Sequence, residues 1–328
     1  MKPAFLSSLS ALARQVCGGM LLLLLGHTVA WGQQPAAASS SRLDWSDVTR
    51  FWQTMDRLAS ATSRADSLKL VQTQYLDPAS AGLRAYVEAA HATPADLLAA
   101  WRTHRQYLAA IRPAMLQIKA QETAISQAVR ELKKVYPAAV IPAVYFGVGK
   151  FEVGGTAFPG ALYIGAELKC TSPHPPLGEL RPDVRPSVST VTTVSTPCIH
   201  EIIHVQQQLR NGTTNLDGAL LEGAAEYLAY RFTGRLGATA AFAYGNQHEA
   251  EVRHLFAQEA NQPIAAKWFV ATAEAGSSLP GALGYFVGYK ICDAYYAQAA
   301  DKPAALRQLL TLSQPAELLA FGRKYLSR

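Results

Sequence analysis

Apolar residues recur at helical spacing along the first part of the chain. Residues 44–62 carry a stripe of Val48, Phe51, Trp52, Met55 and Leu58. A second stripe, over residues 113–136, contains Met115, Ile118, Ile125, Val129 and Leu132, and Tyr136-Pro137 ends it. Between the stripes, Thr93-Pro94 has the form of a helix start, a capping residue followed by proline. The pattern predicts a helical region over residues 44–137, with the stripes in the core.

The spacing of apolar residues changes after residue 138. Residues 140–151 and 160–168 are rich in strand-forming types and predict two neighbouring strands. Gly154-Gly155 and Pro159-Gly160 predict turns between them. Residues 171–197, rich in proline, serine and threonine, predict a long loop, which in a compact domain is more often functional than idle.

Two further helices are predicted after this loop. Thr196 can cap a helix whose first residue is Pro197. Residues 215–234 form a second helical segment, with Asp217 as the candidate cap and Gly234 as the candidate stop. No strong domain boundary follows. We therefore expect one helix-rich α+β domain over residues 44–328: a helical part (44–137), a sheet with two helices (138–235) and a helical C-terminal part (236–328).

The N-terminus has the pattern of a secretory signal peptide. Residues 1–32 contain Lys2 and Arg14, no acidic residue, an apolar run and then small residues. The run has roughly 13 residues, fewer than the ~20 that a membrane anchor, the alternative, would need. We expect residues 1–32 to be removed, residues 33–43 to be a linker, and the protein to be exported to the periplasm or medium with no stable membrane span.

Composition excludes two classes of protein. The net charge of +6, which becomes +4 once Lys2 and Arg14 are removed, is not gathered into a basic patch interleaved with aromatic residues, so we expect no nucleic-acid partner. The mature chain keeps Cys170, Cys198 and Cys292, which allow at most one disulfide. A Cys170–Cys198 bond would close the proline-rich loop, but the chain is not a disulfide-built scaffold.

The segment TPCIHEIIHVQQQ, residues 196–208, carries the candidate chemistry. His200 and His204 lie four positions apart, so on a helix their rings project from one face. That spacing lets two imidazoles bind one Zn²⁺ at about 2.0–2.1 Å. Glu201 is rotated by about 100° and can reach a water on the metal without binding the metal itself. This is the HExxH arrangement of zinc metallopeptidases. The alternative is two solvent-facing histidines on an amphipathic helix.

A third metal ligand is available on the next helix. Glu222 follows His204 by 18 positions, an interval that lets the first helix end, the chain turn and the second helix return alongside. Gly223 and Ala224 are small, which favours close packing of the two helices. Glu226 lies one helical turn beyond Glu222 and could accept a hydrogen bond from a metal-bound histidine. Its alternative is a solvated helix carboxylate.

HEIIH together with EGAAEY resembles the paired signature of gluzincins, zinc peptidases whose third ligand is a glutamate. VYFGVGKFEVGGTA, LYIGAEL, HEIIHVQQ, LLEGAAEYLAY and GYFVGYKICDAYY resemble, in matching order, the blocks of a bacterial family called predicted Zn-dependent proteases. That family is related to the gliding-motility lipoprotein B group. The resemblance implies a zincin-like fold and a peptidase.

In this interpretation His200, His204 and Glu222 bind zinc, and Glu201 is the general base. Tyr285 and Tyr289 are candidates to stabilise the oxyanion, although either could be a buried structural residue. Zincins bind substrate backbone along an edge strand, and Gly154, Gly155 and Thr156 lie in the likely counterpart. A glycine turn at a hairpin is the alternative for this segment.

The sequence thus predicts an exported zinc metallopeptidase that acts on peptides or proteins. Endopeptidase activity is preferred slightly, because no clear acidic motif would capture a substrate's amino terminus. One alternative is a non-catalytic zincin-fold protein that acts in binding or envelope assembly. Glu201 favours catalysis, since a structural metal site does not need it. A hydrolase of another bond is a third interpretation, because function follows the site and not the fold. Nothing in the sequence indicates the oligomeric state.

Overall fold

The computed structural model describes residues 42–209, 211–237, 239–270 and 279–328. The predicted signal peptide and nearly all of the linker lie outside the described residues. Within the described ranges, no helix combines the length and the apolar character needed to cross a membrane.

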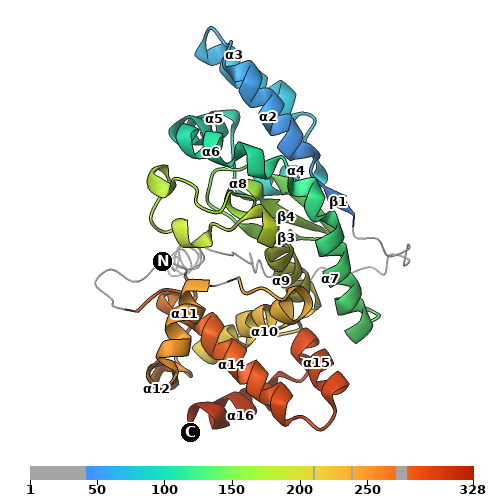
Figure 1. Cartoon of the computed structure of the whole chain (residues 1–328), viewed down its shortest axis with the longest axis vertical. Coiled ribbons are helices and arrows are strands. Elements are labelled where there is room, and N and C mark those ends of the chain that lie inside the picture. Colours follow the sequence, from blue (N-terminus) through green and yellow to red (C-terminus); the bar gives the residue numbers. More distant parts are fainter. Residues whose placement is uncertain (1–41, 210, 238, 271–278) are drawn as a thin grey trace, which may run out of the picture.

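The first part of the chain is helical, as its apolar stripes predict (Figure 1). Its elements are α2 (Ser46–Leu58), α3 (Arg64–Leu70), η1 (Val71–Leu76), α4 (Ala81–Ala89), α5 (Pro94–Thr103), α6 (Arg105–Met115), η2 (Ile118–Gln121) and α7 (Glu122–Val135). Thr93 caps α5 through a reciprocal pair of bonds with Asp96. The stripe over residues 113–136 is not one helix, because η2, a 3₁₀ turn, interrupts it. Met115 and Ile118 are three residues apart, a spacing that suits a 3₁₀ turn as well as an α-helix.

The sheet is small and mixed. Its order is β1 (Leu43–Asp44), β2 (Ala143–Gly147), β4 (Ala161–Gly165) and β3 (Gly155–Phe158). β1, β2 and β4 run parallel, whereas β3 pairs antiparallel with β4 and forms one edge. With the many helices, this sheet makes the chain a helix-rich α+β protein, as expected.

The strand prediction is correct for β2 and β4, which are neighbours, and wrong in two details. Residues 166–169 form the short helix α8 (Ala166–Lys169) instead of extending the strand. The segment around Gly154-Gly155 contains β3, which begins at Gly155, so the edge strand that the family resemblance implied is present and the turn that the local pattern predicted there is not. Glycine there reflects a close approach, because a Cβ on Gly155 would lie 3.1 Å from Oε1 of Glu201. Only the second predicted turn is present, and Gly160 adopts a φ of +73° in it.

The long loop contains three short 3₁₀ turns, η3 (Leu177–Glu179), η4 (Arg185–Ser187) and η5 (Val191–Thr193), and leads into α9 (Ser195–Gln206). The predicted cap at Thr196 is wrong. Because η5 runs directly into the helix, Thr196 lies inside α9, and its hydroxyl lies 3.2 Å from that of Thr233. Cys170, Cys198 and Cys292 are buried free thiols, so the Cys170–Cys198 bond is not formed.

The second site helix, α10 (Asn215–Thr233), ends at Gly234 as predicted, with φ at 72°. Its cap is Thr214, however, and not Asp217. Asp217 occupies the third helical position and completes the capping box with Thr214. The remaining helices are α11 (Thr239–Gln247), α12 (Glu249–Glu259), α13 (Ala266–Phe269), α14 (Leu283–Gln298), α15 (Lys302–Thr311) and α16 (Pro315–Leu326).

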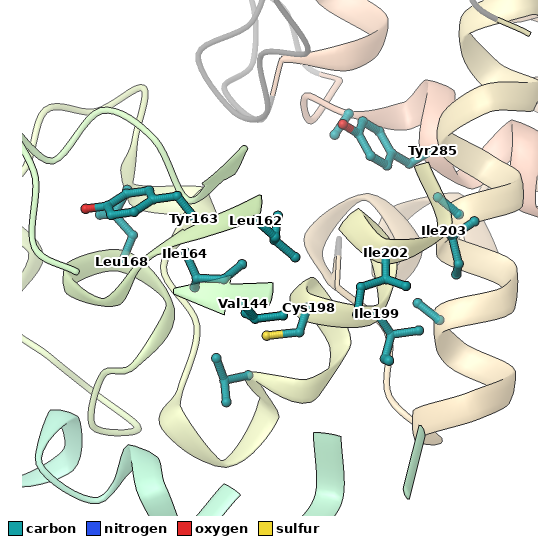
Figure 2. Close-up of a cluster of buried hydrophobic side chains, with 14 of the residues drawn as sticks. Val144, Leu162, Tyr163, Ile164, Leu168, Cys198, Ile199, Ile202, Ile203 and Tyr285 are labelled. Carbon is teal, nitrogen blue, oxygen red and sulfur yellow. The ribbon is translucent and has the colours of Figure 1, made fainter. Parts of the chain in front are cut away.

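Helix α9 lies between the sheet and the C-terminal helices (Figure 1). Figure 2 shows Leu162 and Ile164 of β4 on the same side of the strand, towards Cys198 of α9, while Tyr163 points the opposite way. This is the alternation expected of a strand buried on both faces. Tyr163 stacks on Tyr86, with ring centroids 4.6 Å apart. The sheet therefore anchors α9 on one side and the N-terminal helices on the other.

Helices α10 and α14 cross with their backbones in contact. A Cβ on Gly223 would lie 2.2 Å from the carbonyl carbon of Gly288, and a Cβ on Gly288 would lie 1.7 Å from the carbonyl oxygen of Ala219. The smallness of Gly223 therefore permits the approach of α14 and not, as we expected from the sequence, that of α9. This crossing holds α10 in place from the side opposite the sheet.

We predict that Gly288→Ala lowers the free energy of unfolding by about 3 kcal/mol, because the new methyl group meets backbone that cannot move aside. Gly178→Ala is the matched control, since a Cβ there meets no atom within 4 Å. Urea unfolding of both variants measures the difference. Equal stabilities would show that the helix crossing is not as tight as described.

A buried carboxylate holds the loop after β2. Oε1 of Glu167, on α8, accepts hydrogen bonds from the backbone N–H groups of Gly149, at 2.9 Å, and Phe151, at 3.4 Å. Phe151 has a φ of 62°, which is uncommon for a residue other than glycine. Burial raises the pKa of Glu167 to about 7, although these backbone bonds oppose the shift.

This raised pKa predicts a stability loss between about pH 4.5 and pH 7. In that window the unfolded chain releases the Glu167 proton while the folded chain keeps it, which costs the folded state about 3 kcal/mol above pH 7. Glu167→Gln should remove this slope from the unfolding free energy measured across the window. Glu131→Gln, on the exposed side of α7, should leave the slope unchanged. An unaltered slope in Glu167→Gln would contradict the assignment.

Candidate metal centre

Three donor atoms from two helices converge at one point. His200 and His204 project from α9 with their Nε2 atoms 2.9 Å apart. Oε2 of Glu222, on α10, lies 3.2 Å from Nε2 of His200 and 3.3 Å from Nε2 of His204. The chain reverses between the two helices, as the 18-residue interval predicts, and brings the carboxylate to the histidines.

These donors fit a tetrahedral zinc site. With bonds of about 2.0–2.1 Å, neighbouring ligand atoms of a tetrahedron lie about 3.3 Å apart. Two of the observed separations, 3.2 and 3.3 Å, match that edge, and the third, 2.9 Å between the two histidine nitrogens, is about 0.4 Å shorter. Two imidazoles and one carboxylate are also a donor set of catalytic zinc sites with three protein ligands. These residues therefore could hold a zinc ion and leave a fourth position for another ligand.

The far side of each ring has its own partner. Nδ1 of His200 lies 3.2 Å from Oε2 of Glu226, and Nδ1 of His204 lies 2.6 Å from Oε1 of Gln207. Because carboxylate and amide oxygens accept hydrogen bonds, each Nδ1 is the donor and each Nε2 faces the donor cluster. Such partners fix the tautomer and the orientation of a ligating histidine. The structure thus places Glu226 where the sequence analysis expected it.

Sequence reasoning missed Gln207. Its amide nitrogen donates to the carbonyl oxygen of Leu221 at 2.8 Å, so this side chain ties His204 to the turn of α10 that carries Glu222. The signal was the run Gln206-Gln207-Gln208 after the second histidine. The run alone cannot show which member faces the site, and Gln207 lies just beyond the end of α9.

The cluster is electrostatically coupled. Burial opposes a charged His200, but hydrogen bonds and charges from Glu222 and Glu226 outweigh burial and raise its pKa to about 10. Burial likewise opposes a charged Glu222, yet the attraction of His204 and His200 holds the pKa of that carboxyl well below its usual range. The site is thus built to hold positive charge among carboxylates.

Glu201 is buried beside this cluster, 2% exposed. Its Oε1 has no hydrogen-bond partner among the described residues. Burial raises the pKa of its carboxyl group, against the attraction of His204 and His200. The side chain lies against the backbone of β3, because a Cβ on Gly155 would be 3.1 Å from Oε1. An unpartnered carboxylate oxygen next to a donor cluster is available to a reacting water or substrate.

The structure separates the two candidate tyrosines. The ring of Tyr285, at the start of α14, is nearly parallel to that of His200, with centroids 6.1 Å apart. Tyr289 instead packs edge-on against Phe242 and Tyr227, with centroids 4.9 and 5.3 Å away. Tyr289 lies one turn further along α14, and its ring belongs to this aromatic cluster. The geometry places Tyr285 at the site and Tyr289 in the packing behind it.

The three candidate substrate-binding residues lie along the sheet edge. Gly155 and Thr156 begin β3, and Thr156 is buried opposite Tyr163 of β4. Gly154 precedes them and contacts Lys169, since a Cβ there would lie 2.4 Å from Cε of that lysine. Of the three, Gly155 is the one placed directly against Glu201.

A cavity of about 310 Å³ opens beside the donor cluster. His200, Glu226, Tyr285 and Lys169 line it, together with the loop from Pro186 to Thr190. Burial lowers the pKa of Lys169, while the charges of Glu201 and Glu226 oppose that shift. The sequence analysis did not identify Lys169, because nothing near it in the chain distinguishes it from a surface lysine.

No protein-family model, curated protein or solved structure matches the chain. The function is therefore inferred from the geometry of the site.

We predict about one zinc ion per chain in the purified protein. Glu222→Ala should lose most of this zinc because it removes a ligand, and Gln207→Ala should weaken binding by about 10- to 100-fold because His204 loses its support. Elemental analysis and competition with a chelator measure both effects. Gln208→Ala, whose side chain is exposed, is the matched control and should bind like wild type. Wild-type affinity in Glu222→Ala would rule out the three-residue site.

Proposed function

We propose that the chain is an exported zinc-dependent peptidase with a zincin-like fold, similar to the predicted Zn-dependent proteases. The observation that carries the proposal is the convergence of His200, His204 and Glu222, with the buried, unpartnered Oε1 of Glu201 beside them at the sheet edge. The signal-peptide pattern of residues 1–32 supports export.

His200, His204 and Glu222 would hold the metal, and Glu226 and Gln207 would orient the two imidazoles. When bound, zinc supplies Lewis-acid chemistry, polarising a substrate carbonyl group and activating a water. Glu201 accepts a proton from the attacking water and later delivers it to the leaving amine. Its burial favours this role, because a carboxylate removed from bulk water is a stronger base than an exposed one.

Tyr285 is the candidate to stabilise the carbonyl oxygen as negative charge develops on it. Its ring lines the cavity next to His200. A phenol donor held in a partly dry cavity stabilises such a charge more than the same donor does in water.

The strand β3 is the candidate binding edge for substrate backbone. It is the edge strand of the sheet and passes Glu201 at Gly155. An extended peptide that pairs with a sheet edge gains main-chain hydrogen bonds without regard to its side chains. Pairing here would carry the peptide past the proposed base and the donor cluster.

The environment of Glu201 also favours catalysis over the binding or assembly alternative. A buried carboxylate oxygen without a partner costs free energy of about 1–3 kcal/mol or more. A metal site that served only structure or binding would gain nothing from that cost. A general base needs an oxygen that is free to meet the reacting water.

We predict that Glu201→Gln lowers kcat/KM for peptide hydrolysis by about 10²- to 10⁴-fold while zinc content stays at the wild-type level. A fluorogenic peptide library and a denatured protein mixture are suitable substrates, with products identified by mass spectrometry. Glu131→Gln, a surface carboxylate on α7, is the matched control.

Full activity in Glu201→Gln would exclude this residue as the base. Zinc-loaded wild-type protein that cleaves neither substrate set would favour the non-catalytic binding protein.

A further inference from the structure

The cavity beside the donor cluster contains a half-buried cation. Lys169 follows β4 on α8, and its side chain lines the cavity together with His200, Glu226 and Tyr285. Its Nζ donates a hydrogen bond to the carbonyl oxygen of Ser187 at 2.6 Å. An ammonium group carries three N–H donors, so this bond leaves capacity for another ligand.

The contact with Gly154 places the ammonium group close to the proposed substrate path. Gly154 lies directly against it, because a Cβ at that position would be 3.1 Å from Nζ and 2.4 Å from Cε. Gly154 immediately precedes β3, so the cation lies at the start of the strand that passes Glu201. Any side chain at position 154 would displace Lys169 from this place.

A role in balancing charge does not explain the position of Lys169. Glu201 and Glu226 are close enough to attract the ammonium group. Among the described residues, however, neither forms an ion pair with it within 4.0 Å, and its hydrogen bond goes to a neutral carbonyl. A lysine that served only to neutralise buried carboxylates would contact them directly, as charge-assisted bonds are the stronger ones.

The rest of the cavity suits a small, partly polar group. Its lining combines hydroxyl groups, from Thr190, Thr193 and Thr196, with the apolar side chains of Val188, Leu236 and Phe269. A volume of about 310 Å³ is near the lower end of the range for ligand pockets, roughly 300–1,000 Å³. It therefore suits one side chain or one terminal residue and not a long segment of peptide.

We propose that Lys169 binds a carboxylate group of the peptide substrate in this cavity. The inference depends on the proposed peptidase function. The carboxylate could be an aspartate or glutamate side chain near the scissile bond, which gives an endopeptidase with acidic preference. It could equally be the free C-terminus, which gives removal of C-terminal residues. Both sources share the same chemistry and are separated by the test.

The test measures binding of three peptides to the full mature protein by calorimetry. All are N-acetylated pentapeptides of alanine with one substituted central residue. The first has a central glutamate and an amidated C-terminus. The second has a central glutamine and an amidated C-terminus, and the third has a central glutamine and a free C-terminus. The protein carries Glu201→Gln, so that no peptide is cleaved during the titration. The same three titrations are repeated with the double variant Glu201→Gln/Lys169→Met. The matched control is Glu201→Gln/Lys134→Met, since Lys134 is an exposed lysine of α7.

We expect one of the two acidic peptides to bind at least about tenfold more tightly than the neutral peptide, the size of one charge-assisted hydrogen bond. Tighter binding of the glutamate peptide identifies the side chain as the source, and tighter binding of the free acid identifies the C-terminus. Lys169→Met should reduce the preference to less than about twofold without changing the affinity for the neutral peptide. Lys134→Met should keep it.

Three results would overturn the proposal: equal binding of all three peptides, no binding of any, or a preference that survives Lys169→Met. Equal weakening of all three in Lys169→Met would show a structural role. Lys169→Gln, which is also neutral and keeps hydrogen-bonding capacity, replaces Lys169→Met if circular dichroism shows that the latter is unfolded. Because this experiment measures binding, the two proposals can fail separately. If the protein prefers the acidic peptide but contains no zinc and hydrolyses no peptide, the peptidase function is refuted and the carboxylate-binding site is supported.

Discussion

The contact between α10 and α14 is the constraint on which the site depends. Glu222 can reach the two histidines only if α10 stays pressed against α9, and α14 presses it there from the other side. Gly223 and Gly288 let the two backbones touch, so the position of α10 is set by hard contact and not by adaptable side chains. Gly288 lies one turn beyond Tyr285, so the same contact also sets the tyrosine over His200.

The free-energy cost of burying charged groups explains why the histidines and carboxylates of the site have hydrogen-bond partners. His200, Glu201, His204 and Glu226 are all nearly inaccessible to water. Burying such groups is unfavourable unless each has a partner. Gln207 and the backbone N–H of Gly237 provide partners for His204 and Glu226 respectively. Glu201 keeps an oxygen without a partner, so the stabilising bonds serve the histidines and leave the proposed base free.

Local patterns predicted the helices and the core of the site well. The apolar stripe of α2, the start of α5 and the HExxH spacing each depend on residues within one or two turns, where geometry is fixed by the helix. The position of Glu222 beside the two histidines could be predicted because a short connection between helices leaves few arrangements. The N-terminal end of α9 could not be predicted from the sequence, because it depends on η5 running directly into the helix. The local pattern could not decide between a turn and an edge strand at β3, because a glycine suits a turn and a close approach to Glu201 equally.

The features that sequence missed are those made by contacts between distant segments. Gly223 was assigned to the wrong neighbour, because smallness does not tell which helix approaches. Tyr285 and Tyr289 share a motif, and it is their ring contacts that separate them, since Tyr285 lies beside His200 and Tyr289 packs against Phe242. Lys169 and Gly154 lie 15 positions apart on opposite sides of a hairpin, and their contact sets the cation beside the sheet edge. In the proposed peptidase, strand β3, Glu201 and Lys169 would lie along one path, where pairing with the strand would position a peptide backbone and the charge of Lys169 would select a peptide with a carboxylate. Affinity from the edge and selectivity from the cavity can then vary independently, since they depend on different residues.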